Sequence, residues 1–221
     1  MLPFTRQQFF ESFAAYNSAN WVAAVAAYPL ALMAIALAWR GTPAADRGVS
    51  AVLALMWSWV AVVYQWLHFS LINPAAKLFA LAFLVQAALF AMHAALGRGV
   101  EYRRRSQVRT VTGTTFISYA LIGYPLIGVL AGERYPAMPL FGMAPCPLLI
   151  FTFGLLVWAT RARWWLWIVP ILWSIVGGSA SIFLSVPQDW ALPISAIVAL
   201  LILFGDRSPA SAVKHPRRSG G

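Results

Sequence analysis

Few side chains in this sequence could do chemistry, and His68 is the most prominent of them. Tyr64 stands one helical turn before it, and Asn73 lies in the turn that follows it. Together these three residues could bind a ligand or a proton. In the alternative interpretation, His68 forms a hydrogen bond to a neighbouring helix and binds nothing.

Cys146, the only cysteine, lies between two prolines and could act as a nucleophile or carry a lipid. No His, Asp or Lys stands beside it in the sequence to activate the thiol, so a small packed residue is the alternative. A metal site needs three or four protein ligands, whereas His68, His93 and Cys146 are the only soft candidates, and no two have ligand spacing. We therefore expect no catalytic residue, no metal and no cofactor. An intramembrane enzyme is disfavoured, and it would have to use Cys146 with His68.

Other polar residues gather at the helix ends predicted for one face of the protein. Tyr124 and Ser179 join them because the neighbouring Pro125 and Gly177-Gly178 can loosen a helix and expose its backbone to a substrate. The alternative is that seven helix ends are polar in any case, and that Gly177 and Ser181, four residues apart, serve close helix packing. The predicted ligand-binding residues are Tyr16, Asn17, Asn20, Tyr64, His68, Asn73, Tyr124, Cys146, Ser179 and Asp189.

The side chains named above must be positioned by apolar segments, and apolar segments make up most of the sequence. The chain is 61% hydrophobic and 10% charged, with a mean hydropathy of +0.73, whereas soluble domains carry roughly 25% charged residues. A water-soluble fold is therefore excluded. The apolar runs have the length that crosses about 30 Å of hydrocarbon as a helix. We predict an all-α polytopic transmembrane bundle of about seven spanning helices, formed as one domain by residues 1–205.

The predicted elements follow from hydropathy and from turn residues. Thr5 and Gln8 form a capping box, which predicts a short interfacial amphipathic helix before the first span. Proline density in the loop over 133–147 favours an extended cap. Several tryptophans, Trp57 among them, are interpreted as interface anchors. The interfacial helix covers 4–16, the spans cover 20–39, 49–69, 75–96, 115–131, 148–160, 164–185 and 190–204, and a basic, disordered tail covers 206–221.

Basic residues set the expected orientation. Thirteen of the 16 Lys and Arg fall in alternate loops and the tail, and only Arg6, Lys77 and Arg134 fall on the other side. Cytoplasmic loops are enriched in Lys and Arg, so the amino terminus should be outside and the carboxyl terminus in the cytoplasm. The net charge of +10 is then explained by topology and by contact with anionic lipid, without nucleic acid. The amino terminus has no removable signal peptide.

Three segments are similar to a known family. They are Phe9 to Asn17, the pair Asn73-Pro74, and Phe141 to Pro147. They resemble an uncharacterised family of small bacterial multi-pass inner-membrane proteins, and the resemblance covers nearly the whole chain except the tail. It implies the architecture and a bacterial inner membrane, and it brings no catalytic residues.

Two function classes remain open. The first is a small-solute permease or binding protein with a polar pocket on the outer face, and a densely packed interior would contradict the permease. The second is an accessory or assembly subunit of a membrane complex, which should show an exposed groove of small residues. All six acidic residues lie at or beyond predicted span ends, which disfavours an ion pump because such proteins use an ionisable residue inside the membrane.

Overall fold

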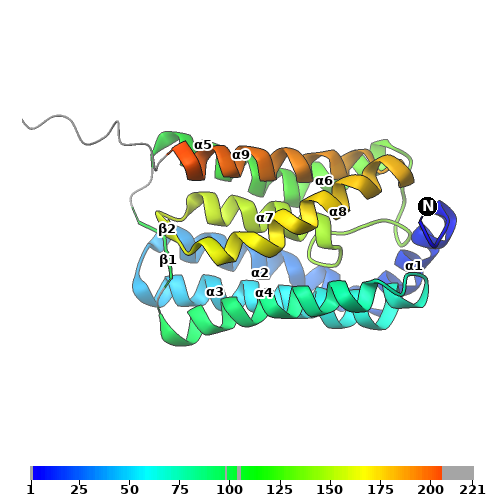
Figure 1. The fold of residues 1–221 in the computed structure, drawn as a ribbon, viewed down its shortest axis with the longest axis horizontal. Helices are drawn as coiled ribbons and strands as arrows, with labels where there is room; N and C mark the ends of the chain where they lie inside the picture. Colours follow the sequence, from blue (N-terminus) through cyan, green and yellow to red (C-terminus); the bar gives the residue numbers. More distant parts are fainter. Residues whose placement is uncertain (1, 98, 104–105, 206–221) are drawn as a thin grey trace, which may run out of the picture.

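The computed structural model describes residues 2–97, 99–103 and 106–205. The predicted tail, 206–221, lies outside the described residues. The long helices run roughly parallel, and the amino-terminal helix lies at one end of the bundle (Figure 1). The amino-terminal helix and the carboxyl end of the last described helix lie at opposite ends of the bundle. This arrangement is expected when the chain runs along the bundle an odd number of times.

Helices form nearly all of the described structure. The α-helices are α1 (Arg6–Ala19), α2 (Trp21–Arg40), α3 (Pro43–Trp59), α4 (Ala76–Leu96), α5 (Gln107–Ser118), α6 (Tyr124–Leu130), α7 (Pro145–Trp158), α8 (Ile168–Leu184) and α9 (Ala191–Gly205). Two π-helical segments are η1 (Val60–His68) and η3 (Tyr119–Gly123), and three 3-10 turns are η2 (Phe69–Leu71), η4 (Trp164–Trp167) and η5 (Pro187–Trp190). Two short strands, β1 (Val100–Glu101) and β2 (Arg161–Ala162), pair antiparallel at the end opposite α1.

Within the residues that the structure describes, six continuous helical runs are long and apolar enough to cross a membrane. They are Trp21–Arg40, Pro43–Leu71, Ala76–Leu96, Gln107–Leu130, Trp164–Leu184 and Pro187–Gly205. The fifth predicted span, 148–160, corresponds to the shorter apolar helix α7. The all-α helical bundle predicted from the sequence is therefore confirmed, and the capping box of Thr5 and Gln8 is present at the start of α1.

Two helices begin well before the residues that hydropathy predicts, by more than one helical turn. The second span starts at Pro43 rather than at residue 49, because Thr42 Oγ1 accepts a 3.2 Å hydrogen bond from Ala45 N and proline suits a first helical turn. The fourth starts at Gln107 rather than at residue 115, where Ser106 caps the helix. The first turns of both helices are polar and precede the apolar segment. A search for apolar segments alone therefore misses them.

α7 is the central helix, and all 14 of its residues are buried. It begins at Pro145, three residues before the predicted start, because proline is favourable in the first turn of a helix. At 1.5 Å per residue it is about 21 Å long, too short for about 30 Å of hydrocarbon. The loop before it was predicted to cap the surface. Instead, residues 138–144 fold into the bundle and are largely buried, and they fill the depth that α7 does not reach.

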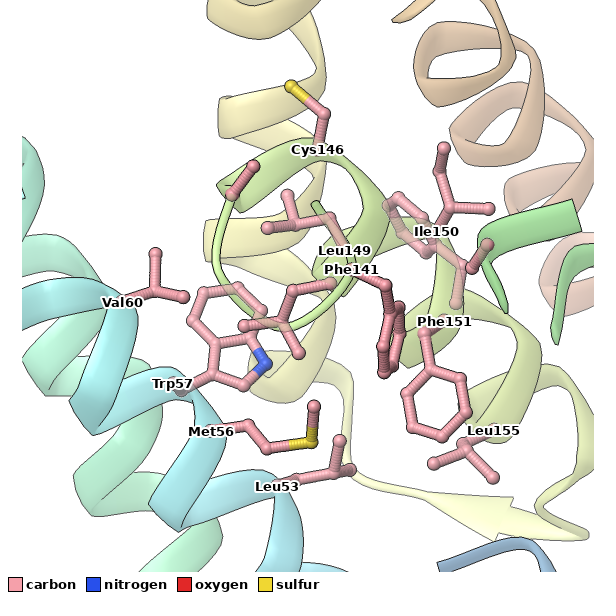
Figure 2. Packing of buried hydrophobic residues seen from close by; sticks show 14 of the residues in the cluster. Leu53, Met56, Trp57, Val60, Phe141, Cys146, Leu149, Ile150, Phe151 and Leu155 are labelled. Atoms are coloured by element: carbon pink, nitrogen blue, oxygen red, sulfur yellow. The ribbon is translucent and has the colours of Figure 1, made fainter. Parts of the chain in front are cut away.

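The core lies between α3 and the segment formed by this loop and α7 (Figure 2). Trp57 is fully buried and donates a 3.0 Å hydrogen bond to Thr152 Oγ1, so its interpretation as an interface anchor is wrong. On the other side of α7, Phe151 contacts Phe141 of the loop with ring centroids 5.2 Å apart. Non-helical backbone at this depth is tolerated where protein surrounds it.

Helices α5 and α7 pack closely against each other through two glycines. A Cβ on Gly113 would lie 2.7 Å from Gly154 O, and a Cβ on Gly154 would lie 2.9 Å from Gly113 O. The small residues predicted to serve packing, Gly177 and Ser181, are in α8. A Cβ on Gly177 would meet Leu192 of α9 at 2.8 Å, whereas Ser181 Oγ bonds within its own helix to Gly178 O.

Candidate functional site

A partly open cavity of about 130 Å³ lies at the α1 end of the bundle, and residues of α1, η1, η2, α4, α6, α7, α8 and η5 line it. Its lining is mainly aromatic and aliphatic, with a small group of polar side chains. Six of the ten predicted ligand-binding residues line it: Tyr64, Asn73, Tyr124, Cys146, Ser179 and Asp189.

Aromatic rings form the wall of the cavity nearest to α1. Phe9 and Phe13 project from one face of α1, four residues apart, and contact each other at 5.1 Å. Tyr64 lies between Phe13 and Phe69, with centroid distances of 5.0 and 5.4 Å and nearly parallel rings. The amphipathic face predicted for the interfacial helix therefore closes the cavity.

The polar part of the cavity is centred on Asp189. The hydroxyl of Tyr124 donates a 2.5 Å hydrogen bond to Asp189 Oδ1, and both residues are buried. The thiol of Cys146 interacts with the same carboxylate. In Figure 2 the sulfur of Cys146 points away from the labelled core residues such as Leu149. A hydrogen-bond acceptor therefore faces a mostly apolar chamber.

Both tyrosines of the cavity are associated with π-helical turns. Tyr64 lies within η1, and Tyr124 directly follows η3. Pro125 has no N–H, so it cannot continue the α-helical hydrogen-bond ladder, which is consistent with the irregular turn before it. Single π-helical turns occur frequently at functional sites. Hydropathy does not distinguish a π-helical turn from an α-helix, so these turns could not be predicted from the sequence.

Two further polar residues of the lining bond to the backbone of their own segments. Asn73 is buried, and its Oδ1 accepts a 3.2 Å hydrogen bond from Ala75 N in the turn before α4. Ser179 Oγ donates to Val176 O at 2.7 Å within α8. Both side chains border the chamber without touching Asp189 through a hydrogen bond.

Next to the cavity, Glu133 and Gln188 form a second buried polar pair. Gln188 Nε2 donates to Glu133 Oε2 at 2.8 Å, and the hydroxyl of Tyr119 donates to Gln188 O at 2.9 Å. Burial raises the pKa of the Glu133 carboxyl, and the hydrogen bond from Gln188 and the charge of Arg6 oppose that rise. Arg6 itself donates to Leu184 O at 2.8 Å, which fastens the start of α1 to the end of α8.

The other four predicted residues hold α1 and its surroundings together and do not line the cavity. Tyr16 donates to Met143 O at 3.3 Å and accepts from Trp59 Nε1 at 2.9 Å, and burial raises the pKa of its phenol. Asn17 Nδ2 donates to Pro136 O at 2.7 Å and to Met138 O at 2.8 Å. These bonds link α1 to the loop that enters the bundle.

Asn20 and His68 also lie outside the cavity lining. Asn20 ends α1, and its Nδ2 donates to Tyr16 O at 2.9 Å. His68 Nδ1 bonds to Val63 O at 2.8 Å within η1, and its ring packs on Tyr16. His68 and Cys146 therefore do not face one chamber. In the part of the chain that the structure describes, no three His, Cys, Asp or Glu side chains group as metal ligands.

A family model matches residues 6–214, which is most of the chain. The chain belongs to the family of unknown function DUF6064. This confirms the resemblance to an uncharacterised family. No curated protein and no solved structure is detectably similar to the chain. Because DUF6064 assigns no activity, the cavity is the feature from which a function can be argued.

Sequence reasoning missed the aromatic part of the site. Phe69, Phe79 and Trp173 line the cavity, but apolar residues in a membrane helix give no signal that separates a cavity wall from a lipid-facing side chain. The four-residue spacing of Phe9 and Phe13 was the one usable signal, since it placed two rings on one face of α1.

Proposed function

We propose that this protein is an integral membrane receptor that binds one small solute in the cavity beneath α1. The observation that carries the proposal is a chamber of about 130 Å³ that combines aromatic walls with the Tyr124–Asp189 pair. Small-molecule sites are typically built this way, from apolar walls and a few convergent polar groups. A dry cavity of about 150 Å³ holds benzene, so the expected solute is of similar size.

The packing of α7 favours binding over passage through the bundle. All residues of α7, including the large ring of Phe151, are buried, and the ring of Trp57 in α3 is also fully buried. A solute that entered from the α1 end would meet this packed helix before the middle of the bundle. A permease would have to displace α7, whereas a receptor needs only the movement of α1.

The proposal also includes a location, the outer face of a bacterial inner membrane. Arg6, Lys77 and Arg134 are the basic residues assigned to the side of the cavity, and the remaining Lys and Arg belong to the other side or to the tail. This asymmetry supports an outward-facing cavity through the preference of basic loops for the cytoplasm.

Cys146 provides the test, because it is the only cysteine and it lines the cavity. The purified protein is treated with N-ethylmaleimide, and the adduct is followed by mass spectrometry. We expect Ser179→Phe, which adds a ring at the exposed rim of the cavity, to slow the reaction at least tenfold. Ser118→Phe, at an exposed position of α5 outside the lining, is the matched control and should leave the rate unchanged.

A bound solute should give the same protection as the Phe side chain. Benzyl alcohol, a neutral molecule slightly larger than benzene, should slow the reaction of Cys146 in a saturable manner. It should have no such effect in Ser179→Phe. Saturation-transfer NMR of the alcohol gives an independent measure of binding. If Cys146 reacts at the same rate in all variants and NMR detects no saturable binding, the proposed receptor function is refuted.

The accessory-subunit alternative required an exposed groove of small residues, and a groove of that kind is present. It lies between α2 and α3, and its lining includes Ala19, Ala23, Ala26, Ala27 and Gly142. Its volume of about 410 Å³ exceeds that of the cavity, but Asn20 and Trp59 are the only polar residues that line it. Lipid tails are as apolar as such a surface, so the groove does not distinguish lipid from a partner subunit.

A further inference from the structure

Asp189 is a buried carboxylate whose neighbours carry no positive charge. Its partners are the Tyr124 hydroxyl and the Cys146 thiol, and the nearby Glu133 acts on it as a like charge. Within the described residues the ion pairs are Asp46–Arg103 and Arg161–Glu101, neither of which involves Asp189. A buried ion without a partner is costly, so either a proton or a bound cation must neutralise it.

One helix end near Asp189 partly offsets the cost of burying a charged carboxylate. Cys146, which contacts it, lies in the first turn of α7, and the amino terminus of a helix attracts negative charge. This attraction is reduced because Pro145 and Pro147 lack an N–H. The helix end therefore stabilises the charge without replacing a true counter-ion.

The walls of the chamber also suit a cation. Phe9, Phe13, Tyr64, Phe69, Phe79 and Trp173 all line it, and the faces of aromatic rings attract ammonium groups. Among the described residues, the protein's own cations contact the rings of Phe10, Trp66 and Trp165. None of those three rings lines the cavity.

We propose that the solute is a small organic ammonium ion, with its charged nitrogen against Asp189 and an apolar body of about the size of benzene among the cavity rings. This inference rests on the receptor function proposed above and adds the chemical class of the ligand. The rings and the carboxylate then act together, as in sites that bind ammonium groups between aromatic side chains.

Three monosubstituted benzenes of nearly equal size test the charge preference: benzylammonium, benzyl alcohol and benzoate. Their affinities are measured at neutral pH from protection of Cys146 against N-ethylmaleimide, and independently by saturation-transfer NMR. We expect benzylammonium to bind at least tenfold more tightly than benzyl alcohol, and benzoate to bind most weakly. Asp189→Asn keeps an oxygen acceptor for Tyr124 and should abolish this preference, so that benzylammonium binds no more tightly than benzyl alcohol.

The outcomes separate the ligand class from the receptor function. If benzylammonium and benzyl alcohol bind with equal affinity, and both lose binding in Ser179→Phe, the receptor function is supported. The cationic ligand is then refuted, since a proton alone would neutralise Asp189. The wild-type comparison needs no variant, so it decides the matter even where Asp189→Asn fails to fold. Absence of saturable binding by any of the three compounds would overturn both proposals.

Discussion

The Tyr124 hydroxyl donates a 2.5 Å hydrogen bond to Oδ1 of Asp189, joining residues 65 positions apart in the chain. This bond connects the helix after the π-helical turn η3 to the turn before α9. Both partners are buried at the cavity. The bond therefore shapes the proposed binding site and also stabilises the fold.

Tyr124→Phe should destabilise the protein through the loss of this single donor. A hydrogen bond contributes about 0.5–1.5 kcal/mol, or about 1.5–3 kcal/mol where the acceptor is charged. We therefore expect the free energy of unfolding, measured by denaturant titration in detergent, to fall by about 0.5–3 kcal/mol. Tyr28→Phe is the matched control, because the Tyr28 hydroxyl is exposed and donates only a 3.5 Å bond to Leu121 O. A loss no greater than that of Tyr28→Phe would show that the bond contributes little.

Gly154→Ala should also be destabilising, for a steric reason. The added methyl group would lie 2.9 Å from Gly113 O and 2.7 Å from a side-chain carbon of Ile117. Overpacking of this kind costs about 1–3 kcal/mol, because α5 and α7 must move apart. Gly205→Ala is the control, since nothing lies within 4 Å of its added Cβ. Thermal unfolding measures both, and equal midpoints would contradict the close contact.

The sequence predicted the bundle well because hydropathy acts over whole helices. It also selected six of the residues that line the cavity, since polar side chains near span ends are rare enough to stand out. It could not pair Tyr124 with Asp189 or Gly113 with Gly154, because these contacts depend on how distant helices are arranged. The boundaries of α7 were predicted two to three residues too late, because proline was taken as a helix breaker although it is favourable in the first turn of a helix.

The basic residues predict an orientation that single-cysteine variants can test. In a Cys146→Ser background, Arg134→Cys lies at the α1 end and Arg161→Cys at the end that carries β2, and both positions are exposed. An impermeant maleimide should label Arg134→Cys on intact cells. It should label Arg161→Cys only after the membrane is opened. The reverse pattern would show that the cavity faces the cytoplasm.

Glu133 should make stability depend on pH, because burial raises its pKa above the ordinary value of 4.5. The folded protein then holds the proton more tightly than the unfolded chain does. The contribution of Glu133 is therefore fully present below pH 4.5, and it is lost as the pH rises from there through the raised pKa.

Glu133→Gln isolates this contribution. The variant stays neutral and still offers an oxygen to Gln188 Nε2, which donates to Glu133 Oε2 at 2.8 Å in the native protein. Its thermal midpoint should therefore rise relative to the wild type as the pH increases through that window. Glu11→Gln, at an exposed position of α1, is the control and should follow the wild type. A constant difference between Glu133→Gln and the wild type at every pH would mean that Glu133 titrates alike in the folded and unfolded states, and that its pairing with Gln188 leaves it effectively solvated.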